Sequence, residues 1–233
     1  MSSEAAGSAR ARREFGEGPL ACVAALVYTL LAIELLFLLA VLPGLVPLIL
    51  LARDGSNVPL AAVCAIPLGP AVSAALFALQ QHRADLTDLR PAAAFWRGYR
   101  LNVGGVLRLW IPWLAWMTVL GVSIAHRDAA GVPGWWIALL VVLAVASTLW
   151  MADVLLITSL FAFRTRDVAR LAAYFLGRTR GVTVGNLCLL IVAVGITLIS
   201  SEVVLTLLGS VFAAALLHTA RPLTAAVTEE FTA

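Results

Sequence analysis

The sequence has no lysine and few charged residues of any kind. All sixteen basic residues among its 233 are arginine, charged residues make up 12%, and hydrophobic residues make up 62%. This composition leaves too little polar surface to cover a water-soluble globular protein. The alternation of apolar and polar residues that is typical of barrel strands is also absent. We therefore expect an all-α membrane protein, because helices satisfy their own backbone hydrogen bonds in lipid.

Motifs of enzymes and metal sites are missing as well. The sequence contains no phosphate-binding loop, dinucleotide fingerprint or nucleophile elbow. Its three histidines are scattered, and Cys22, Cys64 and Cys188 lie in apolar runs without paired spacing, so we interpret the cysteines as small core residues. We expect no enzyme activity, no cofactor and no metal site. The net charge of +3 does not indicate nucleic-acid binding, because the arginines flank apolar segments.

About six apolar runs are long enough to cross a bilayer as helices. Pro43, Gly44 and Pro47 are expected to kink or end the first run, and Pro67, Gly69 and Pro70 to interrupt the second. The interruption is expected to be a packed kink, with a cavity-lining break as the alternative. The predicted spans are residues 20–42, 59–80, 101–125, 135–163, 182–200 and 203–220. Together they form one transmembrane domain over 19–221, between a disordered cytoplasmic tail (1–18) and a second cytoplasmic tail (222–233).

Two arginine-rich segments connect these spans, and we call them the first elbow (residues 81–100) and the second elbow (residues 164–180). Each combines an apolar face at helical spacing with basic residues, which predicts two short amphipathic helices in the membrane interface. Their arginines are expected to face anionic lipid headgroups or partner proteins. The residues in question are Arg97 and Arg100 in the first elbow, and Arg166, Arg170, Arg178 and Arg180 in the second.

The distribution of arginine predicts the orientation of the chain. Thirteen arginines lie on the side of the N-terminal tail, the two elbows and Arg221, whereas only Arg53 and Arg127 lie on the other. Positive residues are retained on the cytoplasmic side, so both termini are expected in the cytoplasm.

The elbows also align with each other at an offset of 80 residues. Phe95 pairs with Phe175, Arg100 with Arg180 and Gly105 with Gly185. Both copies continue into an outward span, which would make the internal repeat parallel rather than inverted. Chance matches are common in a chain so rich in alanine and leucine, and the repeat is held as an open hypothesis.

The segment from Gly69-Pro70 through Ala75-Leu76, and then Phe95-Trp-Arg-Gly-Tyr-Arg-Leu-Asn102, resembles the YesL family (DUF624) of bacterial membrane proteins. The run from Leu156 through Phe161 to Arg164 is similar to that family too, and the resemblance covers roughly residues 15–220. The resemblance implies a bacterial inner (plasma) membrane and a genomic neighbourhood of carbohydrate uptake. It supplies no catalytic residues.

Three ionisable residues lie inside predicted spans, where charge is costly and often functional. Arg108 and Asp153 fall at similar depths in the third and fourth spans, so we predict an ion pair between them. The favoured role of this pair is to hold the two spans in register, and the alternative is that it lines a polar path. Glu34 has no evident partner in the first span. It is expected either to be protonated and bonded to a neighbouring helix, or to bind a proton or cation.

Two further patterns have a structural and a functional interpretation. Trp110, Trp113 and Trp116 recur every three residues. Such a row most often consists of packing or lipid-facing residues, and less often it forms a platform that stacks on sugar rings. Gly177, Gly181 and Gly185 recur every four, which permits close helix approach within the chain or between two chains.

These observations predict a non-enzymatic accessory or assembly factor associated with carbohydrate uptake, whose partners are the lipid bilayer and a carbohydrate transporter subunit. The alternative is a small transporter or channel with Glu34, Asp153 and Arg108 along its path. Paired carboxyls without an aqueous cavity favour the first function, and a mid-membrane cavity that reaches them favours the second. The oligomeric state does not follow from the sequence.

Overall fold

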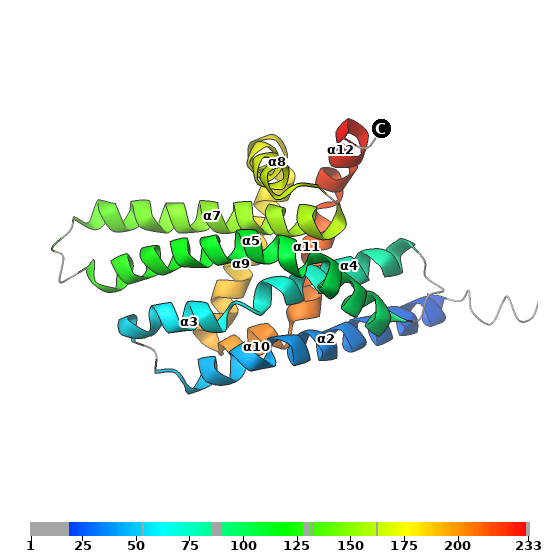
Figure 1. Cartoon of the computed structure of the whole chain (residues 1–233), viewed down its shortest axis with the longest axis horizontal. Helices are drawn as coiled ribbons and strands as arrows, with labels where there is room; N and C mark the ends of the chain where they lie inside the picture. Colours follow the sequence, from blue (N-terminus) through cyan, green and yellow to red (C-terminus); the bar gives the residue numbers. More distant parts are fainter. Residues whose placement is uncertain are drawn as a thin grey trace, which may run out of the picture.

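The computed structural model describes residues 19–52, 54–84, 90–127, 131, 133–161 and 163–231. Over these residues the chain is almost wholly helical and has no strand, which confirms the predicted all-α class. The helices, labelled as in Figure 1, are α2 (Pro19–Leu50), α3 (Val58–Cys64), α4 (Leu68–Ala84), α5 (Pro91–Ala125), α7 (Gly134–Leu160), α8 (Thr165–Arg178), α9 (Arg180–Ile199), α10 (Glu202–Thr206), α11 (Gly209–Thr219) and α12 (Arg221–Phe231), with a 3-10 turn η1 (Gly55–Asn57) before α3.

Four helices, α2, α5, α7 and α9, are each long and apolar enough to cross a membrane. Two bent pairs reach that length only together: η1 and α3 with α4, bent by 42°, and α11 with α12, bent by 53°. The described residues therefore contain four candidate membrane spans, or six if each bent pair forms one span.

The break between α3 and α4 confirms the interruption predicted at Pro67. Proline donates no backbone hydrogen bond, and it restricts the residue before it. The carbonyl oxygen of Ala65, next to the break, accepts a hydrogen bond from the Leu68 N–H at 3.2 Å and another from the Trp110 indole Nε1 at 3.1 Å. A Cβ at Gly69 would lie 2.7 Å from the Trp110 ring, so glycine is required for this approach. The break is therefore packed against a tryptophan of α5.

Three predicted boundaries need correction. Helix α2 continues through Pro43 and Pro47 instead of ending there, with Gly44 pressed against the end of α3. The first elbow does not form a separate interfacial helix, because α5 runs unbroken from Pro91 to Ala125. Pro91 occupies a favourable first-turn position, and no further proline occurs before Pro112, so a change from amphipathic to apolar sequence does not interrupt the backbone.

The third correction concerns the residues after Arg221, which were predicted as a polar tail. They form the helix α12, on which Leu223 and Val227 are fully buried. Pro222 lies in the first turn of α12, where its missing N–H breaks no intrahelical bond. A proline after a span therefore begins a new helix here.

Figure 1 shows how the helices are arranged. Helices α2, α3 with α4, α5 and α7 run alongside one another, whereas α9 and α11 cross them. Helix α11 packs against α2, α4 and α9, and α8 packs against α7. The main hydrophobic core lies where these elements meet. Its buried residues come from α2, α4, α5, α7, α8, α9, α11 and α12.

The proposed repeat has one feature in common between its two halves. Phe95 on α5 and Phe175 on α8 are both fully buried and belong to the same hydrophobic core. The chain continues differently after them, without a break in α5 but with a break at Thr179 between α8 and α9. The internal repeat stays a hypothesis.

Candidate functional site

Two buried polar side chains and one half-buried threonine form a hydrogen-bonded chain that joins α7, α9 and α11. The Asn186 amide Nδ2 donates to Asp153 Oδ1 at 3.0 Å, and the Thr219 hydroxyl donates to Asn186 Oδ1 at 3.2 Å. Asp153 is 0% exposed and Asn186 is 3% exposed. Gly185 allows this contact, since a Cβ there would lie 3.0 Å from Thr219 Cγ2. We call Asp153, Asn186 and Thr219 the polar joint.

The predicted ion pair between Arg108 and Asp153 is wrong. Asp153 takes its hydrogen bond from Asn186 instead, its Oδ2 has no hydrogen-bond partner, and Arg108 is exposed. Val106 and Trp110, two residues before and after Arg108, are buried at 1% and 5% exposure. Two residues correspond to about 200° around a helix, so Arg108 lies on the face opposite to theirs. Similar depth along two helices does not make their side chains face each other.

Glu34 has a partner that no search among side chains would find. Its Oε2 accepts a hydrogen bond of 2.7 Å from the backbone N–H of Ser210, in the first turn of α11. The first N–H groups of a helix have no partner within the helix and favour an anionic or polar acceptor. The other oxygen, Oε1, is buried without a hydrogen-bond partner. Of the two expectations for Glu34, hydrogen bonding to a neighbouring helix is what the structure shows.

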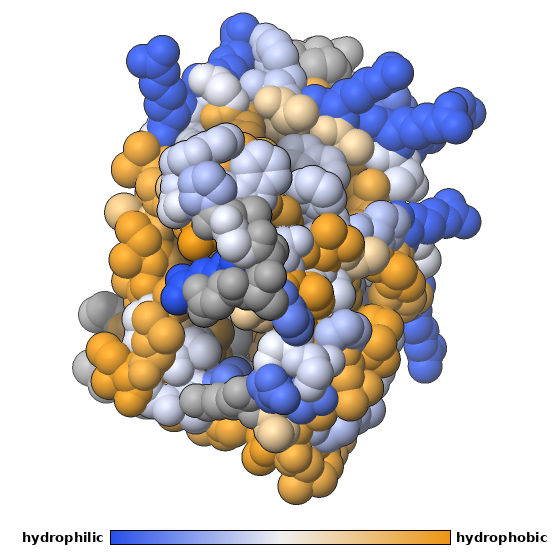
Figure 2. All heavy atoms as spheres, turned by 90° about the vertical axis from the view of Figure 1, so that its left-hand side faces the viewer, coloured by the Kyte–Doolittle hydropathy of each residue, from blue (hydrophilic) through white to orange (hydrophobic). Residues whose placement is uncertain are grey.

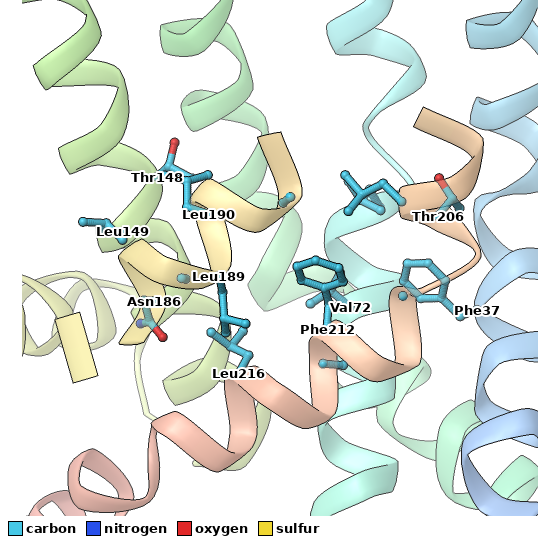
Figure 3. Close-up of a pocket in the computed structure, with 16 residues that line it drawn as sticks. Phe37, Val72, Thr148, Leu149, Asn186, Leu189, Leu190, Thr206, Phe212 and Leu216 are labelled. Carbon is cyan, nitrogen blue, oxygen red and sulfur yellow. The ribbon is translucent and has the colours of Figure 1, made fainter. Parts of the chain in front are cut away.

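An apolar cavity of about 270 Å³ lies where α9 and α11 cross the longer helices (Figure 3). Its walls come from α2, α4, α7, α9, α10 and α11, and nearly all of them are aliphatic or aromatic. Asn186 of the polar joint is one of the few polar side chains on the wall, and neither Asp153 nor Glu34 lines it. Asn186 thus stands between the cavity and the buried carboxyl of Asp153.

The tryptophans of α5 have three different environments. Trp110 is buried and bonds to Ala65, whereas Trp113 is half-buried and donates to the Ser147 carbonyl of α7 at 3.1 Å. Trp116 is 45% exposed. Since two of the three indole N–H groups are used to join helices, the packing interpretation fits these residues better than a sugar platform.

The six elbow arginines that were singled out are all exposed: Arg97, Arg100, Arg166, Arg170, Arg178 and Arg180. On α8 the opposite face, formed by Val168, Ala172 and Phe175, is buried within the protein, and the Trp150 indole of α7 donates to the Ala169 carbonyl at 3.1 Å. The apolar face of α8 therefore packs on protein. Figure 2 shows hydrophilic side chains projecting at the upper margin, where α8 and α12 lie, and hydrophobic ones below, where α2 lies.

The glycine and cysteine patterns have mixed outcomes. A Cβ at Gly177 or Gly181 would meet nothing within 4 Å, so only Gly185 of the three supports a close helix approach within the chain. Cys64 is buried, as predicted for a core residue, but Cys188 is exposed. The side chain of Cys22 lies outside the described residues. Within the described part of the chain, no three His, Cys, Asp or Glu side chains are grouped as metal ligands would be.

Sequence reasoning missed Asn186, Thr219 and Ser210. Asn186 carried a usable signal, because it is the only amide side chain between Val182 and Ser200. Most span hydroxyls do bond to their own helix backbone as expected, among them Thr29, Thr118 and Thr148. The Ser159 hydroxyl is hydrogen-bonded to the Leu155 carbonyl of its own helix and also to the Ser73 hydroxyl at 2.8 Å, which joins α7 to α4.

Comparison with known proteins identifies no relative: no family model matches the chain, and neither a curated protein nor a solved structure is significantly similar to it. The comparisons therefore add no support to the resemblance seen in the sequence.

Proposed function

We propose that this protein is a non-enzymatic accessory or assembly factor of a bacterial inner membrane, with both termini in the cytoplasm. It acts through contacts between its helix faces, its arginine-rich surface and other membrane proteins. The link to carbohydrate uptake, with a transporter subunit as partner, comes from the resemblance to the YesL family.

The observation that carries this proposal is the way in which the ionisable groups are held. The Asp153 carboxyl is bonded to Asn186 and the Glu34 carboxyl to the Ser210 N–H, so each connects one helix to another. The cavity beside Asn186 has mostly apolar walls, and neither carboxyl lines it. Paired groups of this kind suit a structural role, whereas an ion path needs a continuous row of polar groups.

The outer surface offers the contacts that such a role requires. Helix α2 exposes a continuous aliphatic face that includes Leu31, Leu35 and Leu39, each more than half exposed. Lipid tails are as apolar as leucine, so the hydrophobic effect does not drive helices together within a membrane. They associate by packing and by hydrogen bonds, and a long helix face supplies the packing area. The exposed arginines of α8 add charge-assisted hydrogen-bond donors for an acidic partner surface.

The test is to extract the protein from its native membranes in mild detergent and to identify what co-purifies. A near-stoichiometric transport permease or binding-protein receptor is expected. The matched variant Arg166→Gln/Arg170→Gln should lose a partner that binds the second elbow, whereas Arg127→Gln on the opposite side should retain it. Recovery of the protein alone, in several mild detergents, would overturn a stable complex.

A small transporter or channel is the second candidate, with Glu34, Asp153 and Arg108 along its path. It is favoured by two buried oxygens without hydrogen-bond partners, Glu34 Oε1 and Asp153 Oδ2, which are potential ligands for a proton or cation. The exposed position of Arg108 removes one of its three expected groups from the interior. This candidate requires water to reach the polar joint.

A further inference from the structure

We propose that the apolar cavity between α7, α9 and α11 is a binding site for an acyl chain of an anionic membrane phospholipid, whose phosphate group lies near Arg180 and Arg221. The site shares only Arg180 with the second elbow, and it would equip the protein to bind a particular class of lipid.

The walls of the cavity select an apolar occupant. Leu189, Leu190, Phe212 and Leu216 contribute aliphatic and aromatic surface from α9 and α11, as Figure 3 shows. Transfer of a methylene group from water to such surroundings is favourable by about 0.8 kcal/mol, and hydrophilic solutes have almost nothing to bond to there. An acyl chain matches this lining.

The cavity also opens toward the part of the surface that lipid would contact. Leu189, Leu190 and Ala193 on its α9 wall are half-buried rather than buried. Farther along the same helix, Val192 is 51% and Leu198 is 81% exposed. An aliphatic helix surface around the opening places acyl chains of the bilayer directly beside it.

One end of the cavity is polar, and both helices that form it carry arginine there. Asn186 and Thr219 are hydrogen-bonded to each other, so the start of α9 and the end of α11 lie together. Arg180 begins α9, six residues and therefore about 9 Å before Asn186, and Arg221 follows Thr219 by two residues. Both arginines are exposed. Neither arginine lines the cavity, but both lie on the backbone close to its Asn186 end, where long guanidinium side chains would complement a phosphate group attached to an acyl chain.

Asn186 supplies a hydrogen-bond donor between the apolar walls of the cavity and the two arginines. A carboxamide has two N–H donors, and the Asn186 amide uses one of them toward Asp153. Because Asn186 also lines the cavity, its second N–H is available to an acceptor there. The ester carbonyl of a phospholipid lies between phosphate and acyl chain, which is the order of Arg180, Asn186 and Ala193 along α9.

The test is native mass spectrometry of the delipidated full chain, titrated with dioleoylphosphatidylglycerol and with dioleoylphosphatidylcholine. Ala193→Phe fills the cavity and removes space for about two methylene groups, so its affinity for phosphatidylglycerol should fall about tenfold. The control Val194→Phe changes the neighbouring exposed residue and should leave affinity unchanged. Arg180→Gln and Arg221→Gln should each weaken phosphatidylglycerol about fivefold, whereas Arg166→Gln should not.

A second measurement keeps the proposal falsifiable if a variant fails to fold. Phosphatidylglycerol with a photoreactive diazirine in its acyl chain should label Leu189, Leu190, Phe212 and Leu216 of the unmodified protein. Equal labelling of these residues and of the exposed leucines of α2 would mean only a general lipid shell and would overturn the site. Equal affinity for phosphatidylcholine would contradict the proposed selectivity for an anionic headgroup. Displacement of the label by equimolar oleate would show that the site binds a free fatty acid and would contradict a phospholipid as its occupant.

Discussion

The buried carboxyls of this protein are held by donors that carry no charge. A side-chain amide bonds to Asp153 and a backbone N–H bonds to Glu34. Such donors stabilise a carboxyl in an apolar interior whether or not it is ionised, and they need no second buried charge, which would have its own desolvation cost. Arg108 is exposed and adds no second charge to the protein interior.

The polar joint makes a prediction at this scale. Asn186→Ala removes the donor to Asp153 and one of the two acceptors of the Thr219 hydroxyl, leaving the Leu216 carbonyl, and should lower the free energy of unfolding by about 1–2 kcal/mol. Asp153→Asn should cost less, because an amide oxygen at the same place still accepts from Asn186. Both are measured by titration with denaturing detergent. A larger loss for Asp153→Asn than for Asn186→Ala would contradict the assigned roles.

Residue positions along a helix were more predictable than the directions in which side chains point. The depth of Arg108 and Asp153 followed from their distance to the ends of apolar runs. Their failure to meet follows from rotation around α5, where Val106 and Trp110 face the core and Arg108 does not. The residues on both sides of Arg108 are apolar, so the sequence does not indicate which face of α5 packs against α7.

The position of a proline in the sequence does not by itself decide where a helix of this protein ends. The side chains that pack around the proline also decide it. Pro67 lies in the break between α3 and α4, against which Trp110 packs, whereas α2 passes through Pro43 and Pro47. A run of apolar sequence was thus sufficient to predict each of the long helices α2, α5, α7 and α9, whereas the residues of α12 were predicted as a tail. It was insufficient to predict which prolines break a helix, because the neighbouring side chains that pack at each proline come from other parts of the chain.

The close approach of α2 to α3 makes a prediction for the elements. A Cβ at Gly44 would lie 1.9 Å from the Cys64 carbonyl oxygen, and backbone atoms there cannot move aside cheaply. Gly44→Ala should therefore lower the free energy of unfolding by about 1–3 kcal/mol. The matched control is Gly195→Ala on α9, whose Cβ would meet nothing within 4 Å and which should be neutral or stabilising by up to about 1 kcal/mol. Equal melting temperatures for the two variants would show that the contact is unimportant.

For the molecule as a whole, the arginine-rich surface and the apolar helices imply an orientation. We predict that the segment near His126 faces the outside of the cell and that α8 faces the cytoplasm. In a variant without its native cysteines, His126→Cys should react with a membrane-impermeant maleimide in intact cells. Arg170→Cys should react only after the membrane is permeabilised. The reverse pattern would invert the proposed topology.

At this scale too, part of the architecture was accessible from sequence and part was not. Long apolar runs indicated the spans, and the structure contains four to six candidates. The crossing of α9 and α11 over the other helices, which creates the apolar cavity, depends on contacts between residues far apart in the chain (Figure 1). Asn186 meets Asp153 and Thr219 across separations of 33 residues each, and no local pattern encodes such meetings.

The central claim is that Asp153 and Glu34 connect helices and do not form a path for ions. Its most direct test is the flux of protons, sodium and potassium into liposomes that contain the purified protein, compared with protein-free liposomes. If the carboxyls are structural, wild type, Asp153→Asn and Glu34→Gln should all match the protein-free rate. An ion flux that the wild type supports and either substitution abolishes, in a variant that still folds, would contradict the claim and identify the carboxyl as part of a transport path.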